Sequence, residues 1–392
     1  MQSIARFHVV KFAPLLLLGL FFGLTFAPPG IYNTEFLLSR GLTSGTAGFM
    51  FLAGSLVSIS LLASLPTLLS QFGARRVALA LASLVISATV GLALFPGTVY
   101  TIFFFLLFWG MGAILYSLLD LFIEQKIDGA EGITGRVRGI YLTLINVAYT
   151  IGPIIAALII TLLSFAHLYV FAALMCFVFL VLLHTTTRSF IDPKYPRVNL
   201  HYIIRTALKE RLAAKIFIIN FLLQLRYAVI IIYLAVYLHQ ILGFPLGIVG
   251  LMVSIANIPF LMVQFPLGLI ADRYLGEKEI TILGFLMTCA GAFALAFITT
   301  NSIVTMTAIL MLMFTGATVI EIMSESYFFK HIKSRHDAHL TAFRMLSPLS
   351  YIIAPILTTV IMFFLPMNFV FAAVAFVCLL GIPLAISLKD TR

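Results

Sequence analysis

Long apolar runs alternate with short polar breaks along almost the whole chain of 392 residues. Each run is close to the roughly 20 residues that an α-helix needs to cross a hydrocarbon core ~30 Å thick. A membrane β-barrel would show short segments of alternating polarity instead, and the sequence has no such alternation. The pattern predicts an all-α polytopic membrane protein with twelve spanning helices, over residues 12–38, 44–70, 76–95, 99–125, 138–163, 165–186, 213–240, 246–271, 279–299, 303–329, 340–363 and 367–388.

The longest polar interval, residues 187–212, divides these helices into six and six. We therefore expect an N-terminal six-helix bundle over residues 1–186, a cytoplasmic linker over 187–212 and a C-terminal six-helix bundle over 213–392.

The two halves resemble each other at a constant shift of 202 residues, for example from Gly41 to Gly243. The matched pairs are Gly41 with Gly243, Gly48 with Gly250, Tyr149 with Tyr351, and Pro153 with Pro355. A shift that holds over more than a hundred residues indicates a duplicated bundle, and so two pseudo-symmetric halves of the parallel kind found in some transporters.

Composition excludes a water-soluble protein, because 62% of the residues are hydrophobic and the mean hydropathy is +1.14. Cys176, Cys289 and Cys378 lie inside separate apolar runs, so we expect neither a disulfide framework nor a metal site. Nothing in the sequence calls for a cofactor.

The net charge of +10 is explained by topology rather than by nucleic acid, because the basic residues gather between the apolar runs. If both termini are cytoplasmic, all of the 24 basic residues except Arg40 and Arg226 lie on the cytoplasmic side or at its edge. This asymmetry predicts that orientation in an inner (plasma) membrane.

The polar loop after the eighth run, GLIADRYLGEKE, carries Gly268, Asp272, Arg273 and Gly276. It resembles the GxLADRxGRK signature of the major facilitator superfamily, although Leu275 is inserted before Gly276. The resemblance implies a bacterial-type, twelve-span transporter of that superfamily. It also implies a gating role for Asp272 and Arg273, while glycine at 268 and 276 would allow close helix approach. The corresponding loop of the first half has Ser70 at the Asp position.

Two pairs of carboxylates lie inside predicted spans, Asp120 with Glu124 and Glu321 with Glu325. Their i, i+4 spacing puts both members of a pair on one helix face. Two hypotheses stay open: a cytoplasmic ion-pair gate, or proton carriage, since close like charges raise a carboxyl pKa. The basic residues available as gate partners are Arg75, Arg76, Arg136, Arg138 and Arg344.

Arg226 lies near the middle of the seventh predicted span, about 20 Å from its start. A charge at that depth is costly and needs a partner or a function. It either pairs with Glu321 or binds an anionic group of a substrate. Candidate substrate-binding residues are Arg226, Gln224, Asn146, Tyr149, Asn257 and Tyr233, with helix packing as the alternative for the polar ones.

The sequence predicts a monomeric secondary transporter that moves a small solute by alternating access, coupled to a proton or another ion. It has no P-loop, so ATP is not the direct energy source. The alternatives are a multidrug/proton antiporter that exports lipophilic compounds, and a polytopic membrane enzyme or non-transporting receptor.

Overall fold

The computed structural model describes residues 2–127, 134–193, 211–263, 266–267, 276–331 and 337–388, and it contains no strand within them. The first bundle consists of α1 (Gln2–Gly30), α2 (Asn33–Ser39), α3 (Ser44–Phe72), α4 (Ala74–Leu94), α5 (Thr98–Ile127), α6 (Thr134–Leu162) and α7 (Phe165–Thr186). The second consists of α9 (Arg211–Val236), η1 (Tyr237–Ile241), α10 (Leu246–Met262), α12 (Glu277–Phe297), α13 (Ile303–His331), α14 (Asp337–Phe364) and α15 (Phe369–Ile386).

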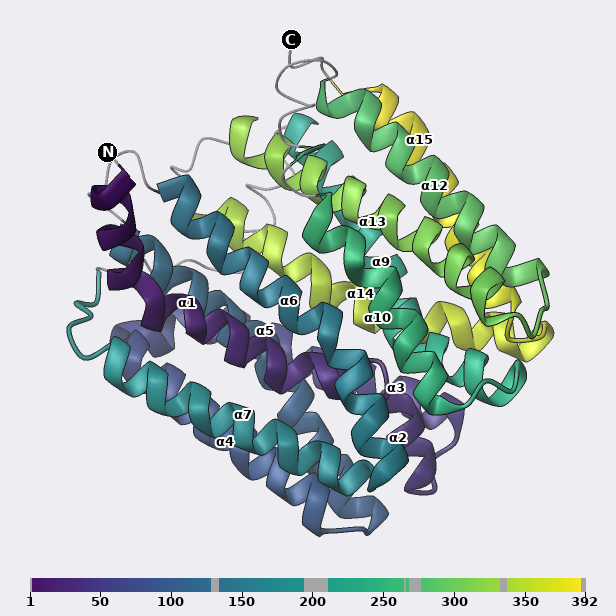
Figure 1. Cartoon of the computed structure of the whole chain (residues 1–392), viewed down its shortest axis with the longest axis horizontal. Helices are drawn as coiled ribbons and strands as arrows, with labels where there is room; N and C mark the ends of the chain where they lie inside the picture. The colour runs from purple at the N-terminus through teal and green to yellow at the C-terminus, as the bar shows by residue number, and fades with distance from the viewer. Residues whose placement is uncertain are drawn as a thin grey trace.

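Figure 1 shows these two bundles side by side, the first in purple to teal and the second in teal-green to yellow. Eleven of the described helices are long and apolar enough to cross a membrane, and α10 is a shorter apolar helix in the eighth position. The protein is therefore an integral membrane protein with the predicted helix order.

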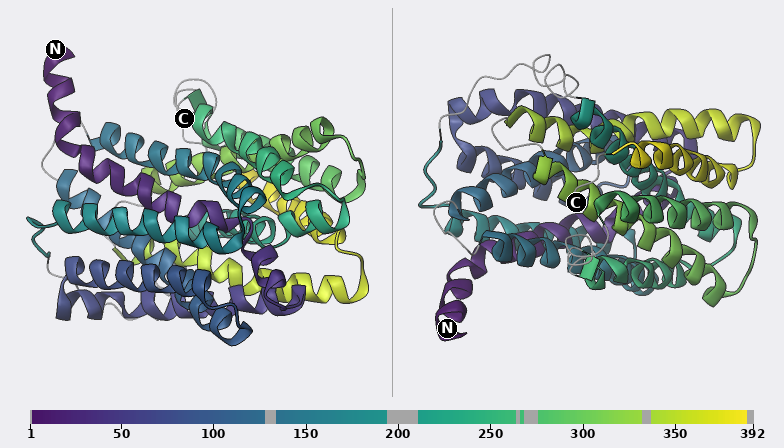
Figure 2. Two further views of the ribbon diagram at one scale, coloured as in Figure 1. Left: turned by 60° about the horizontal axis from the view of Figure 1, so that its bottom comes forward. Right: turned by 90° about the horizontal axis from the view of Figure 1, so that it is seen from above.

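Successive long helices run in opposite directions, as the views in Figure 2 also show. The bundle thus has two ends. We call the end where α1, α4 and α14 begin the terminal end, and the end where α3, α5 and α10 begin the far end.

The first predicted span, residues 12–38, is not one helix. α1 ends at Gly30 and a separate short helix, α2, begins at Asn33. Pro28 and Pro29 cause the break, because neither can donate a backbone hydrogen bond within the helix. The second half has a related irregularity at the same place, where α9 passes into the π-helical turn η1.

The repeat in the sequence is visible in the backbone. Gly41 and Gly243 both have positive φ angles, 86° and 76°, at the turns that follow α2 and η1. A side chain is disfavoured in that conformation, so the same turn requires glycine in both halves.

The bundles meet where α3 packs on α14 and where α6 packs on α10. A glycine lies at each crossing. A Cβ atom at Gly48 would lie 3.4 Å from Pro355 Cβ, and one at Gly250 would lie 2.4 Å from the carbonyl oxygen of Pro153. The lack of a side chain at these two positions lets the bundles approach closely near the far end.

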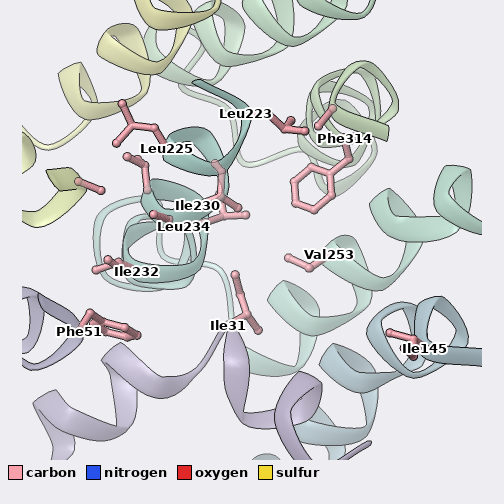
Figure 3. Close-up of a cluster of buried hydrophobic side chains, with 14 of the residues drawn as sticks. Ile31, Phe51, Ile145, Leu223, Leu225, Ile230, Ile232, Leu234, Val253 and Phe314 are labelled. Atoms are coloured by element: carbon pink, nitrogen blue, oxygen red, sulfur yellow. The ribbon is translucent and has the colours of Figure 1, made fainter. Parts of the chain in front are cut away.

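The apolar core continues from one bundle into the other. Figure 3 shows Ile31 and Phe51 of the first bundle beside Ile230, Ile232 and Leu234 of α9. These side chains are at most 3% exposed. The helix α9 therefore lies at the junction of the bundles, which is also where Arg226 is located.

Candidate functional site

An ion-pair cluster joins the bundles near the terminal end. Arg344 of α14 places its Nη2 atom 3.0 Å from Asp120 Oδ2 of α5, and its Nη1 atom 3.5 Å from Glu325 Oε1 of α13. Its Cζ atom lies 5.1 Å from the centroid of the Tyr116 ring. We call Arg344, Asp120 and Glu325 the terminal latch. All three are partly buried, so the pair is less screened than a surface salt bridge.

Four tyrosines, two from each bundle, lie close enough to the charged residues at the junction, or to one another, to interact electrostatically: Tyr116 of α5, Tyr149 of α6, Tyr227 of α9 and Tyr351 of α14. We call them the tyrosine patch. Tyr149 is 42% exposed although it lies about 22 Å from the start of its helix. It is close enough to Glu321 and Tyr351 of the second bundle to interact electrostatically with both. Its exposed ring therefore faces the space between the bundles.

Aromatic side chains continue the patch toward the far end. Trp109 packs edge-on against Tyr351 at a centroid distance of 5.0 Å, and its indole nitrogen donates to Ser55 Oγ at 3.2 Å. Phe51 and Phe105 also pack against Trp109. This aromatic cluster spans both bundles and presents ring faces and edges at mid-depth.

Arg226 does not pair directly with Glu321. The residue is 1% exposed, and none of its three side-chain nitrogens has a hydrogen-bond partner among the described residues. Instead, its Cζ atom lies 4.3 Å from the ring centroid of Phe314 and 5.0 Å from that of Tyr227. The carboxylate of Glu321 accepts a hydrogen bond of 2.6 Å from the Tyr227 hydroxyl. The Tyr227 ring thus lies against the guanidinium while its hydroxyl holds the carboxylate.

A second set of polar contacts joins the bundles at the far end. The Tyr32 hydroxyl donates to the carbonyl oxygen of Leu246 at 2.7 Å, and Gln240 Nε2 donates to Glu35 Oε2 at 3.1 Å. Tyr233, a predicted binding residue, is buried and accepts from Thr358 Oγ1 at 2.7 Å. Its hydroxyl packs beneath Gly48 of the other bundle.

Asn257 and Asn146 lie on opposite sides of the α6–α10 crossing. Asn257 Nδ2 donates to the backbone oxygen of Tyr149 at 3.3 Å, and the backbone oxygen of Asn146 accepts from Thr150. Both amides are half-buried, as is Gln224 of α9. The contact of Asn257 is the helix-joining role that the sequence left as the alternative.

The loop that resembles the superfamily signature lies mostly outside the described residues. Gly268, Asp272 and Arg273 fall there, so their expected gating role has no structural test, and neither does that of the Arg138 side chain. Gly276 is described and immediately precedes α12. Glu124 is exposed on α5, one turn beyond Asp120.

Comparison with known proteins decides the family. The Major Facilitator Superfamily family model matches residues 130–320 and 216–392, which together extend over more than half of the chain. The chain belongs to the Major Facilitator Superfamily. No curated protein sequence matches it.

Solved structures agree with this membership. A crystal structure of the nucleoside transporter NupG is similar over 97% of this chain and 100% of its own, with a TM-score of 0.71 and 13% identity. A mutant of NupG is similar over 95% and 99%, with a TM-score of 0.70 and 14% identity. At this identity the likeness shows the superfamily fold alone. Family and fold together indicate a secondary transporter that binds a small-molecule substrate.

Several residues of this superfamily member were not among the predicted site residues. Tyr116 precedes Asp120 by four positions, so helical spacing puts it on the same face, and Tyr351 is the repeat partner of Tyr149. Those two signals were present in the sequence. Gln240 had no such signal, because only the folded chain brings it to Glu35.

Proposed function

We propose that the protein is a secondary active transporter that works by alternating access. One observation carries the proposal: breakable polar contacts join the two bundles at both ends, and the tyrosine patch at their junction includes the exposed Tyr149. Breaking the Arg344–Asp120 contact would open the terminal end, and breaking the far-end contacts would open the opposite one. Rocking of one bundle against the other then exposes the patch to each side in turn.

For the orientation, we propose an inner (plasma) membrane with both termini cytoplasmic, which makes the far end external. The positive-inside rule supports it. The test is labelling by a membrane-impermeant maleimide in intact cells. Cysteine at Asn301 should react from outside and cysteine at Lys194 should not. The reverse pattern would overturn the orientation.

For the coupling ion we propose a proton. Glu321 is near enough to Arg344 and Glu325 of the terminal latch to interact with them electrostatically, and its carboxylate is held by the neutral hydroxyl of Tyr227 rather than by a direct ion pair. A carboxyl group in that setting can gain and lose a proton without breaking a salt bridge. Arg226 then acts as a distant positive charge behind the Tyr227 ring, rather than as the anionic-substrate ligand that the sequence suggested.

For the substrate we propose a small, uncharged polar solute that carries a ring. Among the described ionisable side chains around the patch, Asp120, Glu321 and Glu325 outnumber Arg344 and the sealed Arg226. That balance disfavours an anionic substrate. The rings of Trp109, Tyr149 and Tyr351 offer stacking surfaces. Nucleosides, which the name of the NupG neighbours gives as their substrates, have this chemistry.

The excess of carboxylates also favours a second candidate, a proton antiporter for lipophilic cations. Purified protein in liposomes separates the two. The test imposes a proton gradient. Uptake of radiolabelled uridine or adenosine supports the uncharged ring-bearing substrate if Trp109→Ala abolishes it and if ethidium does not move. Proton-driven ethidium movement without nucleoside flux supports the second. Neither flux, in protein that is folded by size-exclusion chromatography, would contradict both substrate proposals.

A further inference from the structure

A buried carboxyl group lies in the far-end contact between the bundles. Glu35 belongs to the short helix α2 and is 6% exposed. Its Oε2 atom accepts the hydrogen bond from Gln240 of η1, whereas its Oε1 atom is buried and has no hydrogen-bond partner among the described residues. The group is thus held by a single neutral donor, and that donor comes from the opposite bundle.

An ionised carboxylate in this position is expensive. A buried charge needs a partner or several donors, and one amide N–H does not replace the lost hydration. Burial therefore raises the pKa of Glu35, and the Gln240 hydrogen bond and the nearby His239 oppose that shift only in part. A proton on Oε1 removes the charge and leaves the Gln240 hydrogen bond to Oε2 intact.

The surrounding ionisable groups do not supply the missing partner. On η1, His239 Nδ1 is engaged with the carbonyl oxygen of Phe244, and the Tyr237 hydroxyl donates to Leu295. Before α2, the Tyr32 hydroxyl donates to Leu246. After it, Arg40 donates to Leu92. The helix α3, which also packs on α2, has no ionisable side chain.

The remaining neighbours are α9 and α7. On α9 the Tyr233 hydroxyl accepts from Thr358, and on α7 the Tyr169 hydroxyl donates to Asn33 Oδ1 rather than to Glu35. Burial therefore outweighs the described groups that face Glu35, and the neutral form of its carboxyl group is favoured when the far end is closed.

Opening the far end would reverse this preference. Gln240 and Glu35 belong to different bundles, so their separation admits water to the carboxyl group. Water stabilises the ionised form, and the proton then leaves. We propose that Glu35 is a proton-binding site that is loaded when the far end closes and emptied when it opens. The proposal rests on alternating access, and it makes closure of the far end depend on pH, separately from the coupling proton proposed at Glu321.

The direction of the pH effect follows from linkage. The pKa of Glu35 is higher in the closed state than in the open state, where the group is hydrated and close to its ordinary value. Protonation of Glu35 therefore stabilises the closed far end. This stabilisation is fully present when the pH is below the open-state pKa, and it is lost as the pH rises through the closed-state pKa. Within that window the closed-to-open ratio changes up to about tenfold per pH unit.

The experiment is a distance measurement on full-length protein in lipid nanodiscs. Spin labels are attached at Val99→Cys of the first bundle and Val304→Cys of the second, both exposed at the far end, in a background without native cysteines. In the parent protein the short-distance population should fall as pH rises from 5 to 9. In Glu35→Gln, which mimics the protonated group, it should stay high throughout.

Glu279→Gln is the matched control, because Glu279 is an exposed carboxylate on α12 at the terminal end. It should retain the parent pH dependence. A direct readout is the infrared absorption of a protonated carboxyl group at neutral pH, which Glu35→Gln should remove and Glu279→Gln should keep. Distances in Glu35→Gln that follow pH as in the parent, or a carboxyl band unchanged by that substitution, would overturn the proton site.

Failure of this proposal can be told apart from failure of the proposed function. If liposomes show substrate flux while the Val99–Val304 distance does not change with pH, the protein is a transporter but Glu35 is not a proton-binding site. If the Val99–Val304 distance has one fixed value under every condition and no probe is transported, the alternating-access proposal is contradicted.

Discussion

The glycine at the α6–α10 crossing gives the sharpest test of how the bundles close. A Cβ atom at Gly250 would lie 2.4 Å from both the Pro153 carbonyl oxygen and Ala157 Cβ. Ordinary contact needs about 3.5–4.0 Å, so Gly250→Ala requires the two helices to separate by about 1 Å. The Pro153 oxygen belongs to the backbone of the opposite bundle and has no rotamer with which to move aside.

The energetic effect follows from that displacement. Overpacking of this kind costs about 1–3 kcal/mol. The penalty falls only on the far-end-closed state, since an open far end removes the contact. The ratio of closed to open molecules should therefore fall about 5- to 150-fold. Gly48→Ala should act in the same direction but less, because its nearest atoms, the Tyr233 hydroxyl and Pro355 Cβ, lie at 3.0 and 3.4 Å.

The assay is the Val99–Val304 spin-label distance, with Gly45→Ala as the matched control. A Cβ atom at Gly45 meets nothing within 4 Å, and the residue lies on α3, one turn before Gly48. That substitution changes helix propensity without adding a contact between the bundles. The long-distance population should rise in the order Gly45→Ala, Gly48→Ala, Gly250→Ala. If Gly250→Ala matches Gly45→Ala, closure at this crossing does not depend on the missing side chain.

Three individual contacts also give testable predictions. Asp120→Asn should weaken the terminal latch and raise cysteine accessibility at the tyrosine patch from the terminal side, and the charge swap Asp120→Arg with Arg344→Asp should restore part of the parent level. Arg226→Met should leave thermal stability equal or higher, because the guanidinium is buried without a hydrogen-bond partner among the described residues. If the free energy of unfolding falls by more than about 3 kcal/mol, Arg226 has an ionic partner. Asp192→Ala should lower stability by about 0.5–2 kcal/mol in thermal unfolding, because Asp192 Oδ1 accepts from the backbone N–H of Ala74 at the start of α4. The control Arg188→Ala should have no comparable effect.

Hydropathy predicted the helices well because the bilayer imposes one requirement on every span. An apolar run of about 20 residues has few other ways to satisfy its backbone polar groups. The shift between the halves indicated a duplicated bundle, and the paired residues Gly41 and Gly243 share a positive φ. The break between α1 and α2 was missed, although Pro28 and Pro29 marked it in the sequence.

The site was less predictable, since its partners come from distant helices. The sequence indicated Arg344 as one of five possible gate partners and did not distinguish among them. Only the structure, in which Arg344 of α14 contacts Asp120 of α5, identifies it as the partner. The surroundings of Arg226 depend on Phe314 of α13, 88 positions further along the chain by their numbers. Sequence spacing has no information about which ring will cover a buried guanidinium. Asp272 and Arg273 keep their predicted gating role as a prediction.

The two glycine crossings have a consequence for the ancestry of the fold. Gly48 contacts Pro355, and Gly250 contacts Pro153. Each residue of the first contact is the repeat partner of a residue in the second. The interface therefore has isologous form, in which one patch meets a copy of itself, as in a twofold symmetric dimer. Two separate copies of a single six-helix half could have formed this joint before they were fused, and fusion would have freed each half to acquire its own charges.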